Sequence, residues 1–326
     1  MTPLLAVLSS ANAQTGDTGG VWQFFVYFFS PVLPFLSHFL AVVPFYAYAL
    51  VFLFVGKLLY EKTSSFAFID ELTERDNPAF GACLAGYLVG LALALTGAFP
   101  SSGDSYAVAV KDMTTGGVLA ILLLRASIWI NDKLILDHFS INVEMLRDRN
   151  LGTGAAVAGS CIGTGLLLAG ALTGESEGWG QSVRDIVVYW TVGQLLFIGG
   201  ARAFYATAGY NVQETLENDN NAAAGISLGG FLAALGILLW AVLHNASGNL
   251  AEELALIVVT AAFGIPVLLF SSIVTQKLIL PHISLPKEIA IDKNCAAGLI
   301  CATASLATAI LLAATLLSTA NFLAPL

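Results

Sequence analysis

The chain has few charged residues. Asp, Glu, Lys and Arg make up only 11% of its 326 residues, against about 25% in ordinary soluble domains. Hydrophobic residues make up 57%, and the mean hydropathy is +0.81. A chain of this composition cannot cover a folded surface with groups that water solvates. A soluble globular domain is therefore excluded.

Several chemical motifs are also missing. The four cysteines show no Cys-x-x-Cys spacing, so they indicate neither a zinc site nor a disulfide framework. The chain contains no Walker A loop and no His-Glu-x-x-His pair. Gly225-Ile226-Ser227-Leu228-Gly229 matches the hydrolase pattern Gly-x-Ser-x-Gly, but it opens an apolar run instead of following a strand. We expect no enzyme, no catalytic residue, no metal and no cofactor.

The net charge of −9 is spread over the chain, and no dense basic patch stands out. Nucleic acid is therefore not an expected partner.

What the chain does contain is long apolar runs. Each is about as long as the roughly 20 residues that a helix needs to cross a bilayer, and each is continuously apolar instead of alternating, which excludes a β-barrel. The runs are 39–60, 79–99, 115–136, 152–173, 185–207, 222–244, 253–280 and 295–318. The sequence predicts an all-α polytopic membrane protein with eight transmembrane helices in a lipid bilayer.

The N-terminal residues form a separate region. Residues 1–20 carry the weak cleavage-like stretch Ala11-Asn12-Ala13 without a preceding cation, so we expect an uncleaved external tail. Residues 21–36 are dense in aromatics and contain Pro31 and Pro34. Aromatic side chains favour the headgroup level. We therefore expect an interfacial helix in the outer leaflet, and assign residues 1–38 to the tail and this helix.

The positive charges predict the orientation. Ten of the thirteen Lys and Arg residues lie at or next to the loops that follow the odd-numbered spans. The positive-inside rule places those loops in the cytoplasm. Both termini are then expected outside.

A polar segment occurs twice. KLILDHFS at 133–140 returns as KLILPHIS at 277–284, an offset of 144 residues, and ELTERDNPA at 71–79 resembles ETLENDNNA at 214–222 at an offset of 143. A fainter copy, KLLYEKTS at 57–64, indicates that each half consists of two hairpins. An interval of four spans returns the chain to the same side of the membrane. The sequence predicts two parallel four-helix units, 39–180 and 181–326, forming an internal pseudo-dimer.

The even-numbered spans begin with a repeated polar element. Asn77 precedes Pro78, which is good helix-start chemistry, and Asn150, Asn220 and Asn294 stand at corresponding positions. One interpretation is capping alone. The other is that four helix N-termini surround a cytoplasmic vestibule and attract an anion, or that the adjacent acids present a ring to cations. These acids are Asp76, Asp148, Asp219 and Asp292.

The same spans carry small residues four apart, a spacing that lets helix backbones approach closely in a membrane. We expect these helices at the centre and the odd-numbered ones against lipid. The packing candidates are Gly86, Gly90, Gly159, Gly163, Gly225 and Gly229.

Five basic residues are further candidates. Arg125 lies deep in a span, where a charge costs at least about 2.5 kcal/mol, so it should face protein or water. It is either functional, in gating or anion contact, or a structural tie. His138 and His282 follow Lys133 and Lys277 by five residues. They either form a pH-responsive or phosphate-contacting rim or are basic residues at helix C-termini.

The segment Asp76-Asn77-Pro78-Ala79, followed by Gly86, Gly90 and LALALTG at 91–97, resembles the YjfL-like family of bacterial inner-membrane proteins of unknown function. The likeness covers about residues 40–320 as two fused units. The second unit has Asn221 where the first has Pro78. The resemblance implies a bacterial inner membrane and a cytoplasmic PspA-like membrane-stress protein as a partner. It brings no established activity.

Two functions follow from these features. The first is a channel or transporter that passes a small ion or solute through the glycine-rich even helices. The second is a membrane scaffold whose charged loops dock a cytoplasmic envelope-stress protein. A homo-oligomer is compatible with both.

Overall fold

The structure, a computed structural model, describes residues 27–100, 105–173, 178–244 and 248–319. The expected external tail, residues 1–20, lies outside the described residues. Throughout the described ranges the regular structure is helical, and no strand occurs in them. Residues Val51–Leu326 form one compact unit and Met1–Leu50 another.

Within these described ranges, eight helices are long and apolar enough to cross a membrane, which confirms the predicted number of spans. Their bounds are α3 (Val32–Thr63), α5 (Pro78–Thr96), α6 (Tyr106–Ile130), α8 (Leu151–Leu172), α9 (Trp179–Thr207), α11 (Ala222–Leu243), α12 (Leu250–Leu278) and α14 (Cys295–Thr319).

The first of these helices differs from its prediction. A separate interfacial helix was expected over 21–36, but residues 32–36 belong to the continuous helix α3, and residues 21–26 lie outside the described part. Pro34 does not break α3 because it stands in the first turn, where backbone N–H groups have no partner within the helix. Whether the aromatic start of α3 lies in the headgroups stays a prediction.

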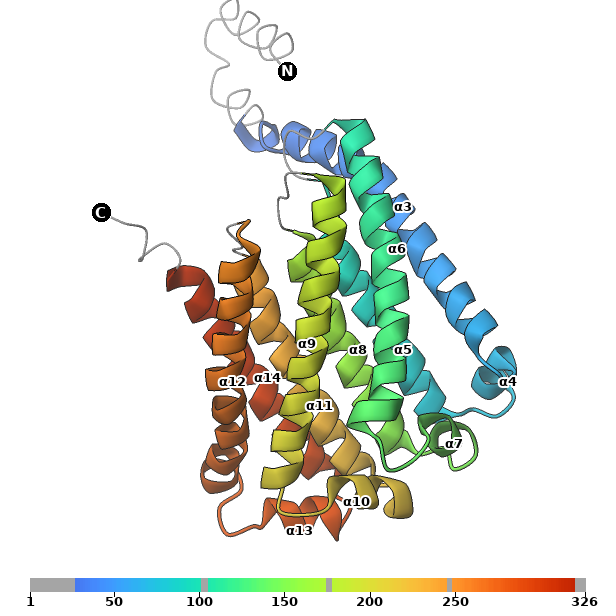
Figure 1. Cartoon of the computed structure of the whole chain (residues 1–326), viewed down its shortest axis with the longest axis vertical. Helices are drawn as coiled ribbons and strands as arrows, with labels where there is room; N and C mark the ends of the chain where they lie inside the picture. The colour runs from blue at the N-terminus through green and yellow to red at the C-terminus, as the bar shows by residue number, and fades with distance from the viewer. Residues whose placement is uncertain (1–26, 101–104, 174–177, 245–247, 320–326) are drawn as a thin grey trace, which may run out of the picture. The chain divides into compact units, whose positions relative to one another are not determined.

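Four short helices precede the even-numbered spans, and all lie at one end of the bundle in Figure 1. They are α4 (Phe68–Thr73), α7 (Ile141–Leu146), α10 (Val212–Asp219) and α13 (Leu285–Ala290). We call this the loop end. A π-helical turn, η1 (Asn131–Ile135), joins α6 to it and contains the first three residues of the first KLIL segment. The two copies of that segment therefore lie on the same side, as predicted.

The four even-numbered spans, α5, α8, α11 and α14, pack in one row in chain order. In Figure 1 the helices α6, α9 and α12 lie in front of the row. They contact the row, and α9 contacts both α6 and α12. The side chains of α8 and α11 are the most buried among the spans, while large apolar side chains such as Trp129, Leu195 and Phe263 are exposed on the odd-numbered helices. The expectation that the even helices are central therefore holds for α8 and α11. The helices at the ends of the row are α5 and α14, and α14 is no more buried than α12.

Glycine residues allow the helices of the row to pack with their backbones in contact. A Cβ added at Gly159 would lie 2.1 Å from the carbonyl oxygen of Gly229, and one added at Gly90 would lie 2.3 Å from that of Cys161. Only a residue without a side chain permits such backbone contact. All six glycines predicted as packing residues meet a neighbouring helix within 3 Å of such a Cβ.

The two units are present in tandem, but the row corrects their predicted arrangement as an internal pseudo-dimer. A two-fold axis relating α5 and α8 to α11 and α14 would pair α14 with α5 as it pairs α8 with α11. In the described residues the extensive contacts join only successive helices of the row. The second half therefore continues the first instead of closing on it.

Candidate functional site

The predicted asparagines at the loop end are helix caps. The side-chain oxygen of Asn77 accepts hydrogen bonds from the backbone N–H groups of Ala79 and Phe80, at 3.1 and 3.2 Å. Asn150 caps α8 in the same way through Thr153. Asn294 caps α14 through Ala296 and Ala297. These contacts fit the capping interpretation.

The third asparagine was assigned one residue too early. Asn221, not Asn220, caps α11, by accepting from the N–H of Ala224 at 3.1 Å. Asn220 has a left-handed backbone with φ of 50°, and that conformation also occurs at the residue before each of the other three caps. Asparagine tolerates it well. The offset between the second pair of loops is therefore 144 residues, as in the first pair, and Glu71 corresponds to Thr215.

Three of the caps also bind the following loop helix. The side-chain amide of Asn77 donates to the carbonyl of Met145 at 2.8 Å, that of Asn150 to Leu216 at 2.5 Å, and that of Asn221 to Ile289 at 2.7 Å. Each acceptor stands five residues before the next cap. One side chain therefore starts a helix and fixes the next repeat unit beside it.

Buried carboxylates complete these caps. Glu71 and Glu144, each 4% exposed, accept the second amide hydrogen of Asn77 and Asn150 at 2.8 Å. Burial raises the pKa of the Glu144 carboxyl, the charges of Asp148 and Glu217 add to the rise, and the hydrogen bond from Asn150 opposes it. This network is structural in character.

The four predicted acids do not form a ring. They follow the row of helix starts, and three of them neutralise nearby bases: Asp148 pairs with Arg147, Asp219 with Lys293 and Asp292 with Lys287. Asp76 is the left-handed residue before its cap. A row of helix starts encloses no vestibule, so the geometry favours capping over ion binding at this end.

Arg125 ties two helices together. Its Nε donates to the Thr63 hydroxyl at 3.0 Å, and its guanidinium lies 4.9 Å from the centre of the Tyr60 ring. Both partners belong to the last turn of α3. The arginine thus reaches the loop end of the bundle, and its contacts are those of a structural tie.

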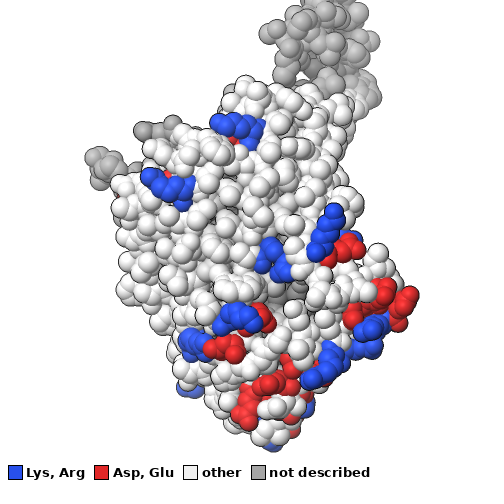
Figure 2. All heavy atoms as spheres, turned by 45° about the vertical axis from the view of Figure 1, so that its right-hand side comes forward, with Lys and Arg blue, Asp and Glu red and all other residues white. Residues whose placement is uncertain are grey.

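The two histidines and their lysines do not converge. Lys133 pairs with Asp132 at 2.7 Å, while Lys277, His138 and His282 are exposed. Within the described residues, no ion pair or side-chain hydrogen bond joins either histidine to a lysine. Figure 2 shows charged groups gathered toward the loop end of this face and a wide uncharged surface above them, as expected for a membrane belt.

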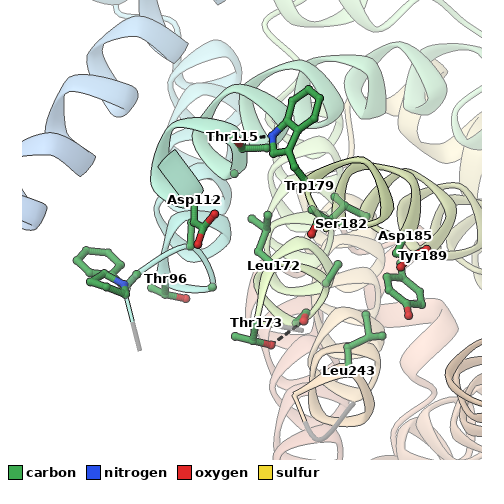
Figure 3. Close-up of a pocket in the computed structure, with 18 of the residues that line it drawn as sticks. Thr96, Asp112, Thr115, Leu172, Thr173, Trp179, Ser182, Asp185, Tyr189 and Leu243 are labelled. Carbon is green, nitrogen blue, oxygen red and sulfur yellow. Dashed lines mark hydrogen bonds between the residues drawn. The ribbon is translucent and has the colours of Figure 1, made fainter. Parts of the chain in front are cut away.

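A cavity lies at the opposite end of the bundle, where sequence reasoning proposed no site. Its volume is about 550 Å³, within the roughly 300–1,000 Å³ typical of ligand pockets. The ends of α5, α8 and α11 and the first turns of α6, α9 and α12 line it (Figure 3). The Trp179 indole donates to the Thr115 hydroxyl at 3.0 Å and so joins α9 to α6 at the cavity.

The cavity is rich in negative charge. Asp112, Asp185 and Glu253 line it, against one cation, Lys111. Asp185 pairs with Arg184 at 2.7 Å, whereas the exposed carboxylate of Asp112 makes no hydrogen bond or ion pair with another described residue. Helix ends of both signs meet here, because the C-termini of α5, α8 and α11 carry partial negative charge and the N-termini of α6, α9 and α12 carry partial positive charge. The excess negative charge of the cavity therefore comes from its side chains.

One wall of the cavity is pre-organised. The buried carboxylate of Glu253 accepts from the Tyr189 hydroxyl and, at 2.7 Å, from the backbone N–H of Gly248. Figure 3 shows Tyr189 beside Asp185 and across the cavity from Asp112. The sequence carried a partial signal, since Asp112 and Asp185 are acids near the starts of two successive odd-numbered spans, at the ends opposite the repeated loops.

These features define a multi-pass helical membrane protein built from four two-helix units, with a repeated structural end and a cavity at the other. A family model described as Domain of Unknown Function (DUF350) matches residues 34–172 and 178–316. The chain belongs to this family, as two tandem copies. The copies are offset by 144 residues, which equals the offset between Asn77 and Asn221 and between Asn150 and Asn294. No curated protein and no solved structure matches the chain.

Proposed function

We propose that this membrane protein binds a small, positively charged organic solute in the cavity at the end opposite the loop helices. The observation that carries this proposal is the exposed carboxylate of Asp112, which lines a cavity of about 550 Å³ and has no partner among the described residues. An alkylammonium group would supply the N–H donors and the charge that this carboxylate attracts.

A transported solute would not pass between the glycine-rich even-numbered helices, which is the route expected from the sequence. The seam between the even-numbered helices is closed by backbone contact, as at Gly159 and Gly229. A solute bound in the cavity would instead pass between the row and the odd-numbered layer. That passage requires those two layers to separate.

Calorimetric titration of the protein in lipid nanodiscs tests the binding. Methylammonium, tetramethylammonium and putrescine serve as cationic probes, with acetamide and acetate as neutral and anionic ones. We expect only the cations to bind, and Asp112→Asn to weaken binding by about tenfold or more, since a charged hydrogen bond contributes about 1.5–3 kcal/mol. Asp70→Asn, an exposed change in α4, is the matched control.

Binding of acetamide as tight as that of methylammonium would refute the proposal, as would an unchanged affinity in Asp112→Asn. Counterflow of a labelled cation into proteoliposomes then separates a transporter from a binding protein.

A second candidate function rests on the loop end. Exposed charges of both signs lie on and around α4, α7, α10 and α13, among them Asp70, Glu74, Arg147 and Lys287. We propose this surface as a dock for a cytoplasmic protein, with a PspA-like stress protein as the partner that the resemblance implies. Equal recovery of that protein after neutralising all four loops would exclude docking there.

The proposed location is a bacterial inner membrane, with the loop end in the cytoplasm and both termini outside. The positive-inside rule supports this orientation. Cysteine labelling from one side of intact cells at Asp70→Cys and at Ser182→Cys, which lie at opposite ends, tests it.

A further inference from the structure

The three contacts within the row are one contact repeated. Counted from each cap asparagine, the second residue of a helix meets the fourth residue of the next helix. The ninth residue of a helix likewise meets the eighth of the next. The pairs are Ala79–Gly154, Gly152–Gly225 and Ala223–Gly298 for the first contact, and Gly86–Ala158, Gly159–Gly229 and Gly230–Ala302 for the second.

Each even-numbered helix therefore has two different faces. We call the face toward the next helix, which includes the second and ninth residues, the forward face. The face toward the preceding helix, which includes the fourth and eighth residues, is the backward face. A contact between two unlike faces is heterologous. Each helix that joins through one face still has its other face available for a further contact. The row necessarily ends in one unused face on each side.

The unused backward face belongs to α5. It consists of Gly81, Ala85, Leu88 and Ala92, the positions that α8 fills with Gly154, Ala158, Cys161 and Gly165. Ala85 and Ala92 are exposed, and a Cβ at Gly81 would meet no atom within 4 Å.

The unused forward face belongs to α14. It consists of Ala296, Thr303, Ala307 and Ala314, and all four are exposed. Thr303 stands where the other three helices have Gly86, Gly159 and Gly230. Threonine still belongs to the small residues that membrane helices use for close packing.

The hydrogen bonds between units are unused at the same two places. Asn77, Asn150 and Asn221 each donate to a carbonyl of the next unit. The amide of Asn294 donates only to Glu288 among the described residues. The carbonyl that corresponds to the three acceptors, that of Leu72 in α4, receives no hydrogen bond from a described residue.

We infer that a second copy of this chain continues the row, with the forward face of α14 packed on the backward face of α5 in the next copy. The amide of Asn294 then donates to the Leu72 carbonyl across the interface. The occupant follows from continuity: the same two faces, with the same hydrogen bond, already pair three times within the chain. Further copies add in the same way, and the chain of contacts either closes into a ring or extends as a row.

Subunit counting in liposomes tests this arrangement. The protein is labelled with one fluorophore per chain, reconstituted at dilutions that span the transition, and counted by photobleaching steps. Ala85→Trp blocks the backward face of α5, and Thr303→Trp blocks the forward face of α14. Because every interface needs one face of each kind, we expect each variant alone to be monomeric, with association weakened by about tenfold or more.

The matched control is Thr191→Trp, the same change at an exposed position of α9, and it should assemble like the wild type. All three variants alter exposed positions, and an unchanged thermal transition shows that each still folds. A one-to-one mixture of Ala85→Trp and Thr303→Trp retains one intact interface per pair. We expect this mixture to form dimers and nothing larger.

Several results would overturn the inference. These are a wild type that stays monomeric at high density in the bilayer, an effect of only one of the two blocking variants, which indicates a symmetric contact, and a mixture that remains monomeric.

Discussion

Asn150 and Asn294 are equivalent caps in the two halves of the chain. Comparing them separates the stability that comes from capping from the stability that comes from the hydrogen bond between units. Asn150 and Asn294 are equivalent by the 144-residue duplication, and both cap an even-numbered helix and bind a glutamate six residues earlier. Asn150 is fully buried and also donates to Leu216, whereas Asn294 is half-buried and makes no such bond with a described residue. Replacing each by alanine should therefore cost different amounts.

The magnitudes follow from the lost contacts. Either substitution removes a cap, which costs about 1 kcal/mol. Asn150→Ala also leaves the Leu216 carbonyl and the buried Glu144 carboxylate without a donor, at about 1–3 kcal/mol each. Neighbouring losses add incompletely, so we expect about 3–5 kcal/mol for Asn150→Ala and about 1–2 kcal/mol for Asn294→Ala.

Steric-trapping measurements of the free energy of unfolding, in bicelles and at a concentration where the protein is monomeric, compare the two variants. Asn142→Ala, at an exposed position of α7, should change it by less than about 0.5 kcal/mol. Equal losses for Asn150→Ala and Asn294→Ala would refute the argument, because the bond between units would then contribute nothing.

Three further predictions concern packing, the arginine tie and acid stability. Gly159→Leu should prevent folding, since its Cβ would meet the backbone of Gly229, whereas Gly199→Leu has no atom within 4 Å of its Cβ and should fold; protease resistance of the purified protein distinguishes them. Arg125→Met should lower the free energy of unfolding by about 1–2 kcal/mol through loss of its hydrogen bond and ring contact, with full stability excluding a tie. Burial opposes ionisation of Asp137, but hydrogen bonds from Arg202 and Gln213 outweigh it, and the folded pKa is lowered. Its contribution is then complete above the unfolded pKa of about 3.9 and is lost as the pH falls through the lower folded pKa, so Asp137→Asn should flatten the acid limb of stability measured by thermal unfolding.

The number of spans and the duplication were predictable because both depend on properties that a sequence states directly. An apolar run of sufficient length has one stable form in a bilayer, a helix. Polar loop residues such as His138 and Ser140 match their copies, and a shared apolar composition does not produce matches between polar residues. The offset of 144 therefore locates the same unit twice from the order of the residues alone.

The one-residue error at the third cap has a physical cause. Asn220 and Asn221 are adjacent, and either side chain is a good cap. What separates them is the backbone: the residue before each cap is left-handed, and asparagine accepts that conformation as readily as it accepts the cap position. Residue type therefore does not decide which of the two asparagines is the cap. Asn221 is identified because it lies 144 residues after Asn77, the same offset that relates the other repeated positions.

The cavity and the row were not predictable from local patterns. A small-residue stripe shows that a helix packs closely but not which neighbour it packs against. Glycines on α8 face both α5 and α11, a two-sided use that a spacing of four residues does not reveal. The cavity depends on where six separate chain segments end, and no segment carries that information alone.

The repeat also explains why the two ends of the bundle differ in chemistry. At the loop end each unit must fix the next, so the caps, their carbonyl acceptors and the left-handed residues have the same geometry in unit after unit. At the other end the bonds between units are not repeated, since one is Trp179 to Thr115 and another is Tyr189 to Glu253. The units differ there: Asp112 lines the cavity, while the residue 144 positions later, Leu256, is exposed on α12. A ligand site that arises after duplication is therefore expected at the end where the repeat is not maintained, which is where the acidic cavity lies.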